Sequence, residues 1–308
     1  MHEFDVLVLG EANADLIVQG QDLLPAFGRE KLVQDLTLTV GGSASIFACQ
    51  AAKLGLRTAL IAIIGDDELG HFMRRALAGQ GVDLRYVQQA AGLKTGATIS
   101  LATPHDRALL TYPGTIAALD SASLDAQQLA AARHIHVASY FLQPALARGL
   151  PDLLAAARAA GSTVSLDTGW DPANRWDGGL AACLAQVDVL LPNQVEALSI
   201  ARESSIDRAL DRLAAQIPTV AIKLGPQGAL ARRGNERAQA SPPPVQAIET
   251  TGAGDSFDAG FVLGHLQGLP LAASLELGVL CGSLSTRAAG GTTAQATLAE
   301  LQSIRARE

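Results

Sequence analysis

Four short apolar runs follow one another between residues 134 and 224: HIHVASY (134–140), TVSL (163–166), VDVLLP (187–192) and TVAIKL (219–224). Each has the length of a strand, and stretches rich in Ala and Leu, typical of helices, separate them. VLVLG (6–10) and TALIAII (58–64) extend the pattern toward the N-terminus. Strands that alternate with helices predict crossover units, and therefore a three-layer α/β/α fold around a doubly wound, mainly parallel sheet.

Two stretches, 32–40 and 96–112, break this pattern because their apolar residues alternate with polar or small ones. Alternation with period two predicts strands that have one wet face, and Pro104-His105-Asp106 supplies a turn within the second stretch. A further short strand is expected at 15–19. Together these segments, about 15–40 and 96–112, predict a small inserted β-sheet that acts as a lid over the carboxyl edge of the parallel strands. The whole chain, 1–308, is then one domain with this lid.

The composition is that of an ordinary globular protein. Of 308 residues, 48% are hydrophobic and 17% are charged, so a sizeable core is expected and broad disorder is not. The net charge of -7, without any run of Lys or Arg, argues against nucleic acid as a partner. Three widely spaced cysteines suit a reducing compartment. We find no cleavable leader and no apolar run of about 18 residues, which predicts a cytoplasmic protein without a membrane span.

The chemistry concentrates in ETTGAGDSFDAG (249–260), where two glycines precede an acid and an apolar helix follows. Gly252 and Gly254 permit a tight turn at a helix start, where backbone N–H groups converge on an anion. Asp255 beside a phosphate would be a costly neighbour unless it removes a proton from an attacking hydroxyl. The structural alternative is a helix start with an Asp cap.

This motif resembles the C-terminal signature of the ribokinase-like (PfkB) family of carbohydrate kinases, Asp-Thr-x-Gly-Ala-Gly-Asp-x-Phe, except that Glu249 stands at the first position. Four more segments resemble family elements in the same order: GEANAD (10–15), the double glycine and helix at 41–55, LPNQVE (191–196) and AIKLGPQGA (221–229). The resemblance implies an ATP-dependent carbohydrate kinase. Asp255 would be its catalytic base, and Gly252, Ala253 and Gly254 would stabilise the transferring phosphoryl group.

The resemblance also implies binding roles. The residues expected at the sugar are Asn13, Asp15, Gly41, Gly42 and Arg107, and those expected at the nucleotide are Asn193, Gly225, Gly228 and Thr251. Asn193 and Glu196 would hold Mg²⁺ through water, because Mg²⁺ prefers oxygen ligands and keeps several waters; alternatively they only cap their helix. A monovalent cation is a further cofactor that the family suggests, although Glu249 replaces the acid beside that site.

The expected acceptor is a small neutral sugar, phosphorylated at a primary hydroxyl. Arg107 is the one plausible cation there, whereas a sugar acid would call for a bidentate arginine. Ile46 stands where sugar kinases of the family often carry Asn, which argues against a strict ribose kinase and for a more apolar pocket. Tyr112, Tyr140 and Phe141 are candidates to stack on a ring.

Several alternatives remain open. One is a nucleoside kinase of the same family, and another is a catalytically silent homologue that senses a sugar or nucleotide. An oxidoreductase is disfavoured because the first strand lacks a Gly-x-Gly-x-x-Gly turn, and a serine hydrolase because the chain lacks a Gly-x-Ser-x-Gly elbow. Lys223 ends an apolar strand and is expected to extend to solvent. The apolar face of the lid predicts a homodimer joined through Leu36, Leu38, Ile99 and Leu101.

Overall fold

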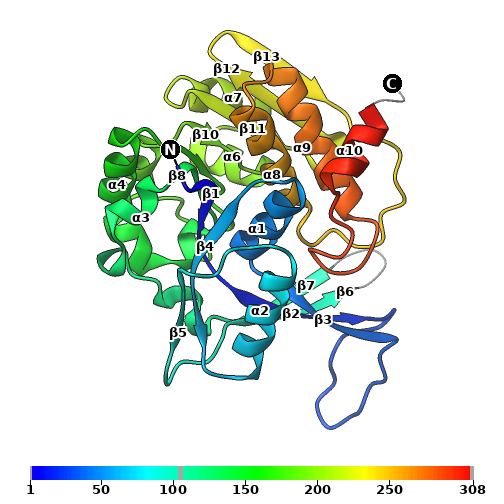
Figure 1. The fold of residues 1–308 in the computed structure, drawn as a ribbon. Coiled ribbons are helices and arrows are strands. Elements are labelled where there is room, and N and C mark those ends of the chain that lie inside the picture. The colour runs from blue at the N-terminus through cyan, green and yellow to red at the C-terminus, as the bar shows by residue number, and fades with distance from the viewer. Residues whose placement is uncertain (1, 103–106, 306–308) are drawn as a thin grey trace.

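A computed structural model describes residues 2–102 and 107–305 (Figure 1). The turn expected at 104–106 lies outside these residues. A nine-stranded sheet has the order β13-β12-β11-β10-β9-β8-β1-β4-β5. Its strands are β1 (Phe4–Leu9), β4 (Thr58–Gly65), β5 (Val87–Ala90), β8 (Ala132–Val137), β9 (Thr163–Leu166), β10 (Val189–Leu190), β11 (Thr219–Lys223), β12 (Ala229–Arg233) and β13 (Glu236–Ala240). The strands from β11 to β5 pair in parallel, as predicted.

Helices cover both faces of this sheet because side chains of a buried strand point alternately to either side. In β1, Val6 and Val8 join one buried cluster, whereas Leu7 and Leu9 join the other. The first cluster packs against α1 (Ser43–Lys53), α2 (Glu68–Gly79), α8 (Ala253–Leu266), α9 (Leu271–Ser285) and α10 (Leu298–Arg305). The second packs against α3 (Ala126–Ala130), α4 (Pro144–Ala159), α5 (Leu180–Leu184), α6 (Gln194–Ala201) and α7 (Ile206–Ala214). The three-layer prediction is confirmed.

Some strand predictions differ from the structure. The apolar run at 134–140 is a strand up to Val137 and then turns, because Ser139 takes a left-handed φ of 52° and starts a short 3-10 helix, Tyr140–Leu142. The hairpin of β12 and β13, which adds two antiparallel strands at one edge, was not predicted. Its strands are rich in Arg, Glu and Gln, so they lack the continuous apolar pattern of the buried strands.

A second, four-stranded sheet has the order β3-β2-β6-β7 and lies to one side of the main sheet (Figure 1). It consists of β2 (Asn13–Gln19), β3 (Asp35–Gly41), β6 (Ala97–Ala102) and β7 (Arg107–Tyr112). The register aligns Asp15 with Thr39 and Thr98, all buried. The neighbouring row holds Leu38 and Ile99, which are exposed. The predicted small sheet is therefore present, with a polar inner face and an apolar outer one.

Among the residues that the structure describes, no helix is both long and apolar enough to cross a bilayer.

Candidate active site

Helix α8 begins at a glycine turn on the carboxyl side of the sheet. Gly252 is its N-cap with a φ of +75°, and a Cβ there would lie 2.8 Å from the Cα of Gly291, so the turn requires glycine. The N–H of Ala253 donates to the carbonyl of Thr250 at 3.3 Å. The N–H groups of Gly254 and Asp255 have no acceptor among the described residues. They lie at the positive end of the helix, where they can bind an anion.

Asp255 stands in the first turn of α8 within a group of acids. Carboxylate oxygens of Asp167, Asp255 and Asp258 lie within 4.8 Å of one another. Loss of solvation, together with the charge of Asp167, raises the pKa of Asp255 to about 7. A carboxylate with such a pKa can accept a proton near neutral pH, as a general base must.

Lys223 enters this group from the end of β11. Its Nζ lies 2.7 Å from Oδ2 of Asp167 and 3.0 Å from both carboxylate oxygens of Asp258. The expectation that Lys223 extends to solvent is wrong, since its side chain is only 11% exposed. Two carboxylates offset the cost of burying the ammonium, and they raise its pKa against the effect of burial.

Asp167 and Asp258 were not predicted as site residues. Sequence signals for both exist, because Asp167 directly follows β9 and Asp258 lies one helical turn after Asp255. Acids that follow parallel strands meet at the same edge of the sheet, where ligands bind.

Asn193 and Glu196 form a capping box at the start of α6. The N–H of Glu196 donates to Oδ1 of Asn193 at 3.0 Å, and the N–H of Asn193 donates to Oε2 of Glu196 at 2.8 Å. Asn193 and Glu196 therefore cap their helix, as the structural alternative predicts. Burial, and then the charge of Asp167, raise the pKa of Glu196 to about 7. Asp167, Glu196 and Asp255 together carry more negative charge than the ammonium of Lys223 offsets, and a bound Mg²⁺, which prefers oxygen ligands, would stabilise that excess charge.

The residues expected at the sugar gather where β2 pairs with β3. Asn13 lies opposite Gly41 in the ladder, and its Nδ2 donates to Oδ1 of Asp15 at 3.0 Å. A Cβ on Gly41 would lie 1.9 Å from that oxygen, and one on Gly42 would lie 2.5 Å from Oδ1 of Asn13. Only glycine leaves room for these two polar side chains. Arg107 is the first residue of β7, in the same small sheet.

Glu11 is a further residue of this region that the sequence analysis missed. It is 3% exposed, and its Oε1 accepts the N–H of Ser43 and the Oγ–H of Ser139, both at 2.7 Å. Burial raises the pKa of its carboxyl. Glu11 thereby joins the segments after β1 and β8 to the start of α1. Its place in GEANAD (10–15), just after the first strand, could have indicated it.

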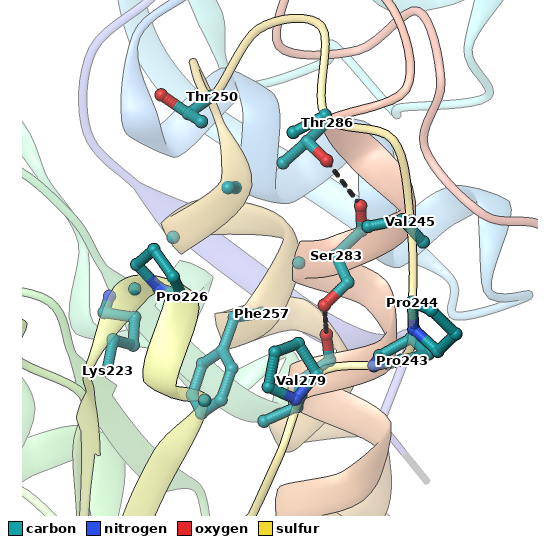
Figure 2. A pocket seen from close by; sticks show the side chains of 17 residues that line it. Lys223, Pro226, Pro243, Pro244, Val245, Thr250, Phe257, Val279, Ser283 and Thr286 are labelled. Atoms are coloured by element: carbon teal, nitrogen blue, oxygen red, sulfur yellow. Dashed lines mark hydrogen bonds between the residues drawn. The ribbon is translucent and has the colours of Figure 1, made fainter. Parts of the chain in front are cut away.

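A pocket of about 520 Å³ adjoins the glycine turn (Figure 2). Lys223, Ala253 and Gly254 lie at one end, and the remaining wall is largely apolar, with Phe257, Val279 and the three prolines 242–244. Of the residues expected at the nucleotide, Gly225 and Gly228 line this pocket, and Asn193 and Thr251 do not. Thr250, the neighbour of Thr251, lines it instead. An apolar cavity beside an anion site has the layout that a nucleotide needs, with its base in the cavity and its phosphates at the helix start.

Residues 3–298 match the family described as pfkB family carbohydrate kinase. The chain belongs to the PfkB family of carbohydrate kinases.

Individual proteins agree with this membership. The fructokinase of Klebsiella pneumoniae is 32% identical over 310 residues, which cover 94% of this chain and 95% of that one. An E. coli structure named for ribokinase II, in complex with ATP and Mg²⁺, has a TM-score of 0.88 at 22% identity and covers 99% of each chain. Adenosine kinase from Sinorhizobium meliloti has a TM-score of 0.87 at 24% identity, over 99% of this chain and 100% of that one. Family and relatives make this chain an ATP-dependent kinase that acts on a hydroxyl of a sugar-type substrate.

This PfkB chain departs from the family pattern at Glu249 and Ile46, and the structure shows what each side chain contacts. Glu249 accepts the N–H of Thr251 at 2.7 Å and the N–H of Gly290 at 3.2 Å, so it braces the turn before α8. Ile46 is 2% exposed, and a Cβ on Gly252 would lie 2.9 Å from its Cγ2. Ile46 thus packs beneath the glycine turn. That Ile46 makes the acceptor pocket more apolar stays a prediction.

Proposed function

We propose that this kinase transfers the γ-phosphoryl group of ATP to a primary hydroxyl of a small neutral sugar, with Asp255 as the base. One observation carries the proposal: a carboxylate whose pKa is raised to about 7 adjoins the N–H groups of Gly254 and Asp255 at the start of α8. A proton acceptor and an anion site therefore share one helix terminus. Transfer of a phosphoryl group to a hydroxyl needs both at one place.

In the proposed mechanism, Asn13 and Asp15 hold the acceptor by hydrogen bonds to its hydroxyls. Asp255 takes the proton of the attacking hydroxyl as the oxygen–phosphorus bond forms and ADP leaves. The N–H groups of Gly254 and Asp255, presented by the turn at Gly252, stabilise the charge on the transferring group, whereas the N–H of Ala253 already donates to Thr250. Positioning and charge stabilisation dominate in such reactions, and the base contributes about 10²–10⁴ in rate.

Magnesium, when bound with ATP, would supply positive charge to the phosphate oxygens. Asn193 and Glu196 would hold it through water, since their own oxygens already serve the cap of α6. We keep a monovalent cation near the turn before α8 as a further proposal from the family resemblance. Glu249, which stands in place of the family's first Asp, already accepts two N–H groups there.

Two alternatives to a neutral sugar kinase differ in their support. A nucleoside kinase is favoured by one observation: the rings of Tyr140 and Phe141 pack edge to face directly after Ser139, which donates to Glu11, and such rings could hold a base. A silent sensor of sugars or nucleotides is disfavoured because it would have no use for a carboxylate tuned to neutrality at the anion site.

We also propose that the whole chain, 1–308, acts as one kinase domain whose small sheet closes over the acceptor and pairs with a second copy. The apolar outer face supports the homodimer, because Leu36 is 57% exposed, Leu38 43% and Ile99 39%. We expect the protein in the cytoplasm, where its three buried, free cysteines would stay reduced. Nucleic acid and membranes are not expected partners.

A steady-state assay of ADP release tests the function. Neutral hexoses, pentoses and nucleosides are compared with 2-keto-3-deoxygluconate at saturating ATP, and the product is mapped by NMR. We expect phosphorylation of a neutral acceptor at a primary hydroxyl and much weaker turnover of the acid. If the acid has the highest kcat/KM, the argument from charge is wrong. If no member of the panel stimulates ADP release, the sensor becomes the better hypothesis.

A further inference from the structure

A ladder of four aromatic rings runs along the loops that follow β8 and β9. Tyr140 and Phe141 meet edge to face with centroids 5.3 Å apart, Phe141 and Trp176 at 5.5 Å, and Trp176 and Trp170 at 5.4 Å. The inner end is closed, since Tyr140 is 2% exposed and its hydroxyl donates to the carbonyl of Gly178. The outer end is open, because Trp170 is 55% exposed. The indole of Trp170 is thus exposed to solvent, and the rings packed beneath it fix its position.

The ladder starts beside the proposed acceptor site. Ser139, just before Tyr140, donates to Glu11, and Glu11 also accepts the N–H of Ser43, next to Gly42. Trp170 follows Asp167, the partner of Lys223, by three residues. The two loops touch, because a Cβ on Gly169 would lie 3.4 Å from the Cα of Ser139. Hydrogen bonds and packing therefore connect the ladder to the segments that hold the sugar and the base.

The loop that carries the ladder is held in an unusual conformation. Asn174 and Trp176 have left-handed φ values of 50° and 55°, which non-glycine residues rarely adopt. The carboxylate of Asp171 compensates by accepting the N–H groups of Arg175 and Trp176, both at 2.7 Å. The indole Nε1 of Trp176 donates to Oδ1 of Asn174 at 2.9 Å. A strained backbone that neighbouring contacts over-determine is commonly found where a ligand binds.

We propose that this ladder binds a second ring of the acceptor, so that the preferred substrate is a sugar linked to another ring rather than a free monosaccharide. The inference rests on the proposed function and narrows its substrate class. An indole face can pack on the C–H face of a pyranose as well as on a nucleobase, so a glycoside and a nucleoside share the chemistry that is recognised. Asn13 and Asp15 would hold the phosphorylated sugar, and Trp170 would cover the attached ring.

Intrinsic fluorescence gives a direct binding test, because Trp170 and Trp176 are the only two tryptophans of the chain and both belong to the ladder. Adenosine and a neutral disaccharide are titrated against free ribose and free glucose. We expect at least one two-ring probe to change the emission and to saturate at a concentration about tenfold lower than either free sugar. The arm that saturates first distinguishes a nucleoside from a glycoside.

Kinetics of Trp170→Ala complete the test. The variant should raise KM for the best two-ring acceptor about tenfold and change KM for a free sugar less than about twofold, while Trp170→Phe should restore most of the loss. Arg175→Ala, an exposed change in the same loop, is the matched control. A free monosaccharide with the highest kcat/KM, or an equal effect of Trp170→Ala on both acceptor classes, would overturn the inference and leave the kinase function intact. Absence of turnover for every acceptor would instead contradict the proposed function.

Discussion

The ammonium of Lys223 bridges Asp167, at the end of β9, and Asp258, in the second turn of α8, at 2.7 and 3.0 Å. This contact ties the helix that presents Asp255 to the edge of the parallel sheet. It also places the positive charge of the site beneath the glycine turn, because a Cβ on Gly254 would lie 3.5 Å from Nζ of Lys223. The position of the base and the anion site therefore depends on a buried ion pair.

Replacing Lys223 with Met should destabilise the protein strongly. Two buried carboxylates would lose their partner, and breaking such a pair typically costs about 3–5 kcal/mol. Urea unfolding at neutral pH measures the change. Lys31→Met is the control, since Lys31 pairs with Asp22 at the surface, where water screens the pair and its loss should change the unfolding free energy far less. If both variants lower the free energy of unfolding equally, the ion pairs of Lys223 with Asp167 and Asp258 contribute no more than a surface pair.

Asp255→Asn should keep the fold and the affinity for nucleotide but lower kcat about 10²-fold or more. The amide has nearly the same shape and cannot accept the proton. Stopped assays of ADP formation measure kcat, and calorimetry measures ADP binding. Asp152→Asn, an exposed change on α4, is the control. A kcat within about threefold of wild type would remove Asp255 from the role of base.

The pH dependence follows from the raised pKa of Asp255, which moves from 3.8 to about 7. Because the base must be deprotonated, kcat/KM should rise through about pH 7 and level off above it. The raised pKa means that the folded state binds this proton more tightly than the unfolded state. The contribution of Asp255 to the free energy of unfolding should therefore fall as the pH rises from about 4 to 7. A rate profile already flat from pH 5 would contradict the assignment.

Activity should vanish with EDTA and return with Mg²⁺, and Glu196→Gln should raise the Mg²⁺ concentration needed for half-maximal rate. The amide can still accept the N–H of Asn193, so the cap of α6 should survive. Glu68→Gln, in the exposed first turn of α2, serves as the control. An unchanged magnesium titration in Glu196→Gln would assign the metal to other residues, with Asp167 and Asp258 as the first candidates.

Sedimentation should show a dimer at micromolar concentration, and Leu38→Glu should convert it to a monomer. A charge on the apolar face of the small sheet would have to lose its water in the interface. Leu93→Lys, an exposed change after β5, should leave the dimer intact. A monomeric wild type would exclude the interface without affecting the kinase assignment.

The sequence alone determined the α/β architecture, the small sheet and the location of the chemistry. Short apolar runs between helical stretches, such as TVSL (163–166), predict buried strands, and the glycines before Asp255 predict a helix start with the anion turn. These are local signals, because period and turn chemistry act over a few neighbouring residues.

The tertiary structure decided which polar groups meet. Lys223 reads as a solvent-directed lysine until Asp167 and Asp258, 56 and 35 residues away, are brought against it. Glu11 reaches Ser139 across 128 residues, and Trp170 meets Trp176 only because the loop after β9 folds back on itself. Burial and charge pairing between distant segments leave no period in the sequence, so they become visible only when the strands that carry them lie side by side.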